Sequence, residues 1–177
     1  LYCCYNRLEN IKKSLKLRQF FSPYIKLYLE LLIQNNDFNF AKKYFKKMWS
    51  ENPHPELKSI TSFLAKELKI QKSDLVKYLI SLNQKNYESQ IMLIENLILE
   101  NNWNEAKKQI QGLLDVKPKK EVCLLMAKIE EGESGDIQRV NSWILRAKNG
   151  LENKMWVCFI SKKAQKEWSS VSEGGHF

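Results

Sequence analysis

An internal repeat is the feature that most limits how this chain of 177 residues can fold. Residues 36–53, NDFNFAKKYFKKMWSENP, align without a gap on residues 101–118, NNWNEAKKQIQGLLDVKP, so the offset between the two copies is constant. The identical pairs are Asn36/Asn101, Asn39/Asn104, Ala41/Ala106, Lys42/Lys107, Lys43/Lys108 and Pro53/Pro118. A weaker third copy follows, in which Asp136, Ile137, Val140, Ile144 and Ala147 align with Asn102, Trp103, Ala106, Ile110 and Leu113. Unrelated amphipathic helices have no reason to repeat in register, so we expect one structural unit that is used several times.

The spacing within the repeat predicts a helical hairpin. A bulky residue at the turn fills the junction between two helices, and a small residue three positions later lets their backbones approach closely. Apolar residues continue that face, and a proline ends the second helix. The structural repeat positions are Phe38, Ala41, Phe45, Pro53, Trp103, Ala106, Ile110, Pro118, Val140, Ile144 and Ala147. Among them we expect Trp103 to matter most, since deletion of a buried Trp side chain costs about 3–5 kcal/mol.

The second and third copies are separated by about 34 residues, and a period of that length with these features resembles the tetratricopeptide (TPR) repeat. The offset between the two strong copies is close to twice this period, so it contains a degenerate middle repeat. We therefore predict an all-α fold, a right-handed TPR-like α-solenoid of antiparallel helix pairs with a short C-terminal tail. An ordinary bundle of amphipathic helices is the alternative.

The predicted organisation has three parts. Residues 1–21 form an N-terminal helix that is a cap or the end of a preceding repeat, and residues 154–177 form a tail that packs on the last repeat. Between them, residues 22–153 hold four repeats, at about 22–55, 56–86, 87–120 and 121–153. We expect Ser22 to cap a helix that reaches Gln34, and the helices of the strongest repeat to span 87–99 and 104–116.

The net charge of +9, from 29 basic and 20 acidic side chains, leaves two interpretations open. A positive chain attracts nucleic acid or anionic lipid. However, the cations are mostly lysines on outward helix faces, for example Lys42, Lys43, Lys46 and Lys47, where a solvated surface is sufficient to explain them.

The last third of the chain resembles the end of the HemY family. The residues that carry the resemblance are Cys123–Glu133 (CLLMAKIEEGE), Gly135-Asp136, Arg139-Val140, Trp143–Ala147, Trp156–Cys158, Trp168-Ser169, Val171-Ser172, Gly175 and Phe177. HemY proteins are bacterial inner-membrane proteins with two N-terminal transmembrane helices and a cytoplasmic TPR domain, associated with late protoheme synthesis, that is, porphyrin metabolism. The resemblance implies that an N-terminal anchor precedes Leu1 in the full-length protein and that the present domain is soluble on the cytoplasmic side. Some related TPR proteins carry a cysteine-rich metal tail, but only Cys158 matches here, so no metal is expected.

The sequence contains no constellation of catalytic residues, and we expect neither an enzyme nor a cofactor. Heme ligation by His54, His176, Cys123 or Cys158 remains an alternative that the resemblance raises. The acidic group Glu130, Glu131, Glu133 and Asp136 is interpreted as a solvated helix end followed by an N-cap.

Binding of another protein is the expected activity. In a TPR solenoid the first helix of each repeat lines the concave face, which here predicts partner-binding residues at Lys26, Glu30, Ile33, Glu88, Ile91, Glu95, Ile98, Val122, Leu125, Ile129 and Glu133. Some of the apolar residues in this list are expected to be buried between repeats, so the list is a superset. Such an acidic and apolar surface suits an amphipathic or basic peptide better than nucleic acid. The prediction is a scaffold that docks a protein partner, possibly a heme-pathway enzyme, at the bacterial inner membrane. The alternatives are a helical repeat protein that binds nucleic acid through its basic surface, and a heme or porphyrin carrier.

Overall fold

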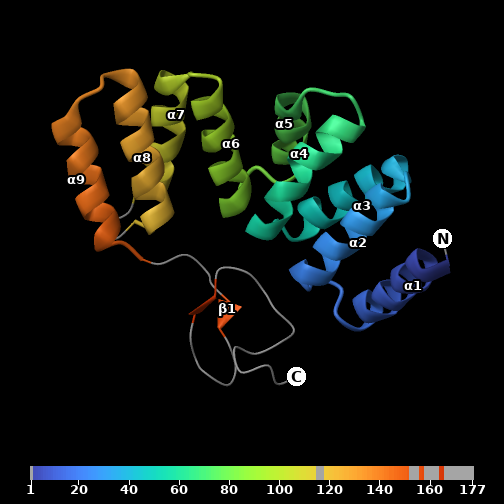
Figure 1. Ribbon diagram of the computed structural model, residues 1–177. Coiled ribbons are helices and arrows are strands. Elements are labelled where there is room, and N and C mark those ends of the chain that lie inside the picture. Colours follow the sequence, from blue (N-terminus) through green and yellow to red (C-terminus); the bar gives the residue numbers. More distant parts are fainter. Residues whose placement is uncertain (1, 115–117, 152–155, 158–163, 166–177) are drawn as a thin grey trace. The chain divides into compact units, whose positions relative to one another are not determined.

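The computed structural model describes residues 2–114, 118–151, 156–157 and 164–165. These residues form α-helices and short 3-10 helices, with one exception, an antiparallel pair of two-residue strands, β1 (Trp156–Val157) and β2 (Ala164–Gln165). The all-α prediction is therefore confirmed (Figure 1). The chain divides into two compact units, Leu1–Gly112 and Leu113–Phe177, which are described one at a time.

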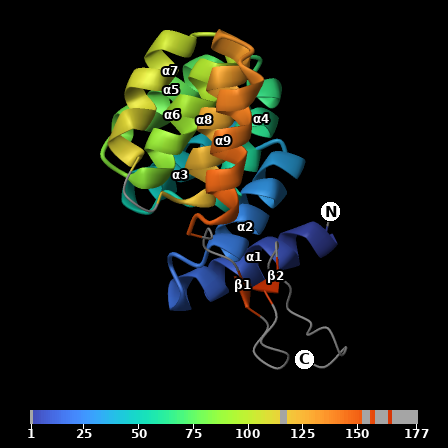
Figure 2. The ribbon, with the colours of Figure 1, turned by 90° about the vertical axis from the view of Figure 1, so that its left-hand side faces the viewer.

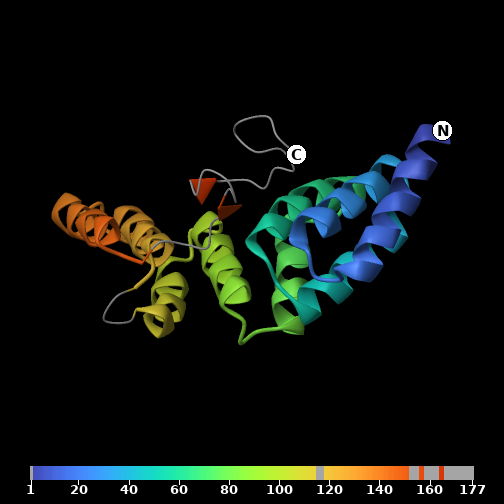
Figure 3. The ribbon, with the colours of Figure 1, turned by 90° about the horizontal axis from the view of Figure 1, so that it is seen from below.

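Unit 1 is a series of helices in which each packs against the next (Figures 1 and 3). In addition, α2 contacts α4, and α3 contacts α5. The buried apolar cluster runs from Leu15 in the first helix to Met92 in the sixth. The elements are α1 (Tyr2–Leu17), α2 (Ser22–Gln34), α3 (Phe38–Glu51), η1 (Pro55–Leu57), α4 (Lys58–Glu67), α5 (Lys72–Leu82), α6 (Tyr87–Leu99), α7 (Trp103–Ile110) and η2 (Gln111–Leu113), the last of which crosses into unit 2.

The two strong copies of the repeat have the same turn, hydrogen bond for hydrogen bond. Asn36 after α2 and Asn101 after α6 have positive φ angles of 60° and 55°, the left-handed conformation that commonly ends a helix. The next residue, Asp37 or Asn102, donates its amide to the carbonyl five residues earlier at 2.9 Å in both turns. The side chain of that same residue then accepts an amide hydrogen bond, 3.4 Å long in both copies, from the first turn of the following helix. One residue thus closes the first helix and caps the second.

The buried positions of the repeat also match. Ala41 and Ala106 are fully buried at equivalent places, as are Phe45 and Ile110 four residues later. On each of the helices α3 and α7, the small residue and the bulky residue lie on the same buried face, as the sequence pattern predicts.

Trp103, the bulky residue at the turn of the second copy, is less buried than predicted. Trp103 is only partly buried, because it lies in the first turn of its helix. Among the described side chains Trp49 is the largest that is fully buried, and its indole Nε1–H donates to the hydroxyl of Ser89 on α6 at 3.1 Å.

Two helix ends differ from the prediction. The helix expected over 104–116 spans Trp103–Ile110 and continues as the 3-10 turn η2. Gly112 lies in that turn where the first copy has Lys47, and glycine is a poor helix former. Ser22 is the first helical residue of α2 rather than its cap, and its hydroxyl instead donates to Glu56 Oε2 at 2.7 Å.

Unit 2 is built on the pair α8 (Lys120–Glu133) and α9 (Ile137–Lys148), which pack side by side (Figures 1 and 2). The turn between them again has a left-handed residue, Gly135 with φ 65°, followed by a cap, Asp136, whose carboxylate accepts the amides of Gln138 and Arg139. Gly135 and Asp136 align with Asn101 and Asn102, so this turn lies at the spacing that the third copy predicts.

The side-chain pattern of the third copy is weaker than its turn. Ala147 is buried and Val140 partly buried, but Ile144 is 39% exposed and Ile137 is 73% exposed. The expectation that Ile144 is a buried repeat position is wrong, because in the described part of unit 2 the one helix against which α9 packs is α8.

After α9 the backbone returns to the start of α8. The amide of Leu151 donates to the carbonyl of Pro118 at 3.3 Å, and the amide of Lys120 donates to the carbonyl of Leu151 at 2.8 Å. The predicted packing of residues 154–177 on the last repeat lies almost wholly outside the described residues.

Candidate docking groove

Five of the predicted partner-binding residues are buried: Ile33, Ile91, Val122, Leu125 and Ile129. They belong to the core, and they are the apolar members of that list for which burial between repeats was expected. For those in unit 1 the reason is packing on several sides, since α2 contacts α1, α3 and α4, and α6 contacts α5 and α7. Apolar residues on most of the circumference of such helices are covered.

The polar members of that predicted surface are less buried than these five, and Glu88 and Glu95 share an internal cation. The Nζ atom of Lys58 on α4 lies 3.6 Å from a carboxylate oxygen of Glu88 and 3.6 Å from one of Glu95. This cation offsets the acidic character that the sequence predicts there. Of the remaining residues in the predicted partner-binding set, Lys26, Glu30 and the apolar Ile98 are partly buried and Glu133 is exposed.

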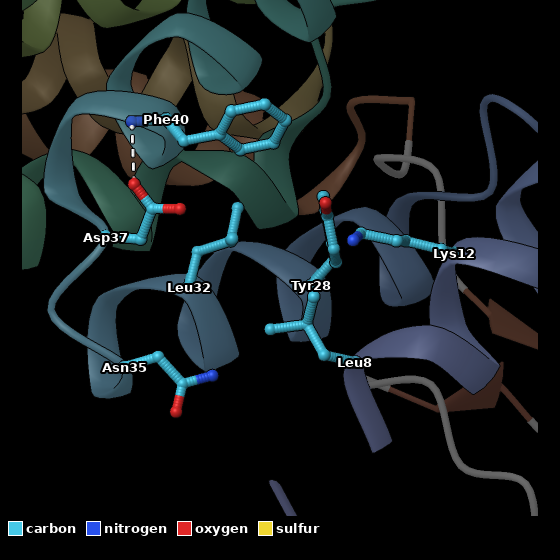
Figure 4. Close-up of a pocket in the computed structure, with 7 residues that line it drawn as sticks. All are labelled: Leu8, Lys12, Tyr28, Leu32, Asn35, Asp37 and Phe40. Atoms are coloured by element: carbon cyan, nitrogen blue, oxygen red, sulfur yellow. Dashed lines mark hydrogen bonds between the residues drawn. The ribbon is translucent and has the colours of Figure 1, made fainter. Parts of the chain in front are cut away.

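A groove between α1 and α3, floored by α2, is a concave surface of unit 1. It consists of two adjoining cavities of about 440 and 370 Å³ that share Lys12, Tyr28 and Phe40. We call it the α1–α3 groove; its lining is Leu8, Lys12, Leu15, Lys16, Gln19, Tyr28, Leu32, Asn35, Asp37, Phe40 and Tyr44. Figure 4 shows the first cavity, with Leu8 and Lys12 on one side, Asp37 and Phe40 on the other, and Tyr28 and Leu32 between them.

The lining residues give the groove a direction. Leu8 and Asp37 line the first cavity, whereas Gln19 and Tyr44 line the second, so α1 and α3 point the same way along it. The intervening α2 runs in the opposite direction and contributes Tyr28 to both cavities. The groove is therefore continuous over about two turns of α1, from Leu8 to Lys16, and reaches Gln19 in the turn that follows.

Aromatic side chains form the floor and the α3 wall. The rings of Tyr28 and Tyr44 meet edge to face with centroids 4.9 Å apart. Burial, and to a lesser extent Tyr28 and Glu51, raises the pKa of Tyr44 to about 12, so its hydroxyl stays neutral. Phe40 is 45% exposed although it is a large apolar residue. Such a side chain on a groove wall provides apolar area to a bound molecule.

Lysines border the groove. On α1, Lys16 lines it directly, and Lys12 does so while paired with Glu9 at 3.0 Å. On α3, Lys43 and Lys47 lie three residues after Phe40 and Tyr44, next to them on the helix surface.

Three carboxylates lie near this cationic border. Asp37 lines the first cavity, Glu9 is held by its ion pair with Lys12, and Glu51 acts electrostatically on Tyr44. Lys12 neutralises Glu9, so Asp37 leaves one end of the groove acidic, whereas at the other end Lys16 and Lys47 outnumber Glu51.

The sequence analysis missed this groove, although a signal was present. Phe40 and Tyr44 are four residues apart on α3, outside the stripe of Ala41 and Phe45. An aromatic pair on a second face of an amphipathic helix indicates a second apolar contact.

Of the residues considered for heme or metal chemistry, the structure describes His54 and Cys123. His54 is in the loop before η1, where its ring accepts the amide of Glu56. Burial raises the pKa of the Cys123 thiol, which keeps it neutral, while Cys158 and His176 are outside the described residues. Among described residues no three His, Cys, Asp or Glu side chains gather as a metal site would require. The predicted N-cap role of Asp136 is confirmed, whereas Glu130, expected on a solvated helix end, is buried and lies 3.5 Å from Arg139.

None of the helices that the structure describes combines the length and the apolar character needed to cross a bilayer. No protein-family model, curated protein or solved structure matches this chain.

Proposed function

We propose that this chain is a non-enzymatic scaffold that docks a partner protein in the α1–α3 groove. The observation that carries the proposal is the combination of an apolar groove, an exposed Phe40 on its wall and lysines along its border. Exposed apolar surface of this kind, rimmed by polar residues, is typical of protein-binding sites.

The wider architecture that we propose is a right-handed TPR-like solenoid of antiparallel helix pairs. Its support is the turn that recurs at Asn36, Asn101 and Gly135 together with a cap on the following residue. Repeats of this kind gain stability from their neighbours and provide extended binding surfaces.

The resemblance to the HemY family supplies the proposed setting. It implies a partner among the enzymes of late protoheme synthesis, at the cytoplasmic side of a bacterial inner membrane. In this proposal the scaffold itself carries out no reaction and holds no cofactor.

The proposal is tested by site-directed photo-crosslinking in membranes of the native host. A photoreactive residue at position 40 should crosslink a heme-pathway enzyme, and the same residue at position 63 should not. Phe63 on α4 is the matched control because it is also 45% exposed and lies outside the groove. Equal crosslinking from both positions, or none from position 40, would contradict the proposal.

Nucleic-acid binding is the second candidate, favoured by the net charge of +9 and the lysines of α1 and α3. It predicts affinity for oligonucleotides that falls steeply with salt. A titration at two salt concentrations separates the two functions, because docking in an apolar groove depends less on salt.

A further inference from the structure

We infer that the α1–α3 groove takes an amphipathic α-helix of a partner protein, with acidic residues beside the apolar face of that helix. This inference rests on the proposed function and specifies the chemistry of the partner. Its basis is the shape of the groove, the state of its backbone groups and its charge.

The shape matches a short helix. From Leu8 to Lys16 the α1 wall extends about 12 Å, at 1.5 Å per residue, and Gln19 lies in the turn that follows the helix. A helix of two to three turns covers that length, and apolar side chains at spacings of three and four residues would meet Leu8, Leu32 and Phe40.

The backbone of the groove walls makes an extended peptide a poorer occupant than a helix. All three elements are helices, so their main-chain N–H and C=O groups are already bonded within α1, α2 and α3. An extended segment needs main-chain partners from a sheet edge, whereas a helix satisfies its own.

The charge selects an acidic partner. Lys16, Lys43 and Lys47 border the groove, and none of the three has an ion-pair partner among the described residues. A second copy of the chain would bring another net charge of +9. The C-terminal segment 152–177 has four lysines against three glutamates, so it offers no acidic complement either.

The same charges set the orientation of the bound helix. Asp37 lies at one end of the groove and Lys16 at the other. Acidic residues of the partner should therefore lie toward Lys16 and Lys47, away from Asp37. A phosphate backbone or an anionic lipid surface is a poorer match, because Asp37 and a lining made chiefly of Leu, Tyr and Phe would face it.

The test uses two synthetic helices and the whole chain. Both peptides are fourteen residues long with leucines on one face; one has glutamates beside that face and the other has lysines. Fluorescence anisotropy should show binding of the glutamate peptide and at least about tenfold weaker binding of the lysine peptide.

Charge reversal in the protein should reverse this preference. With Lys16→Glu/Lys47→Glu, the glutamate peptide should bind about tenfold less tightly and the lysine peptide more tightly. Lys72→Glu/Lys85→Glu changes the net charge equally outside the groove and should keep the original order. Phe40→Ala should weaken both peptides, whereas Phe63→Ala should weaken neither. Circular dichroism of each variant verifies that it is folded.

Each remaining outcome overturns the inference. Equal binding of the two peptides removes the charge selection, and binding that survives Phe40→Ala removes the groove. If single-stranded oligonucleotides or anionic vesicles compete at Lys16 and Lys47 while neither peptide binds, the occupant is not a protein helix. If position 40 crosslinks a partner but the glutamate peptide does not bind, the scaffold function stands and the acidic helix is rejected.

Discussion

At the scale of single residues, the contact between Trp49 and Ser89 ties α3 to α6 within a buried environment. Ser89→Ala would leave the buried indole N–H without an acceptor, which we expect to lower the free energy of unfolding by about 1–3 kcal/mol. Urea denaturation followed by circular dichroism measures the change. Ser81→Ala is the control, since Ser81 is exposed and donates only within its own helix. Similar losses from both variants would show that the indole hydrogen bond contributes nothing specific.

Tyr44 gives a residue-scale prediction about alkaline pH. Its phenol has an ordinary pKa near 10 in the unfolded chain and a pKa of about 12 in the fold, mainly because of burial. Folding therefore favours the protonated phenol. The stability that this provides is fully present below pH 10 and is lost as the pH rises from 10 through 12.

Tyr44→Phe removes that titration. We expect its free energy of unfolding to fall less steeply between pH 10 and 12 than that of the wild type. Between pH 7 and 9 the difference between the two proteins should be constant, which serves as the internal control. Parallel curves across the alkaline range would mean that Tyr44 titrates alike in both states.

At the scale of elements, the left-handed turn residue is what the two strong hairpins have in common. A β-branched residue is strained at the positive φ of Asn101, whereas glycine adopts it freely. We expect Asn101→Val to destabilise unit 1 by about 1–2 kcal/mol and Asn101→Gly to be nearly neutral. Thermal unfolding of both variants measures the change in stability. If the two variants are destabilised equally, the positive φ angle of Asn101 does not determine the stability of the hairpin.

Glycine has opposite consequences at the end of α7 and after α9. A Cβ atom on Gly112 meets nothing within 4 Å, so Gly112→Ala should extend the helix and stabilise the protein by about 0.5–1 kcal/mol. A Cβ atom on Gly150 would lie 2.9 Å from the carbonyl oxygen of Pro118 and 3.0 Å from the amide of Lys120. Gly150→Ala should therefore destabilise by about 1–3 kcal/mol. The two opposite signs, measured by chemical denaturation, are the prediction; a common sign would refute it.

The hairpins were predictable from the sequence because their determinants are local. Asn36 and Asn101, each followed by a capping side chain, and the alanines a few positions later fix the turn and the close packing within a short stretch of chain. The early end of α7 was not predicted. Its cause was visible in the alignment, where Gly112 of the second copy stands opposite Lys47 of the first.

The binding surface was not predictable in the same way, since it depends on contacts between distant elements. Ile91 has the same local pattern whether one or two helices cover it, and only the packing of α5 and α7 against α6 decides that it is buried. Likewise, Lys58 on α4 reaches Glu88 and Glu95, which lie two helices further along the chain on α6. The α1–α3 groove arises from residues of three helices, of which only Phe40 and Tyr44 left a local signal.

At the scale of the whole molecule, the net charge of +9 affects the rate at which a partner associates, and the groove affects the rate at which it dissociates. A long-range positive field speeds the approach of an acidic partner, and salt screens it. Close contacts instead determine how long the complex lasts. The two effects can therefore be separated by kinetics.

Each of the double variants Lys16→Glu/Lys47→Glu and Lys72→Glu/Lys85→Glu lowers the net charge from +9 to +5. We expect both to slow the association of the glutamate peptide by a similar factor at low ionic strength, measured by stopped-flow fluorescence. Only the variant in the groove should also accelerate dissociation, by about tenfold, because of the four substituted lysines only Lys16 and Lys47 border the groove. If both variants dissociate alike, the groove lysines contribute no more than their share of the overall field.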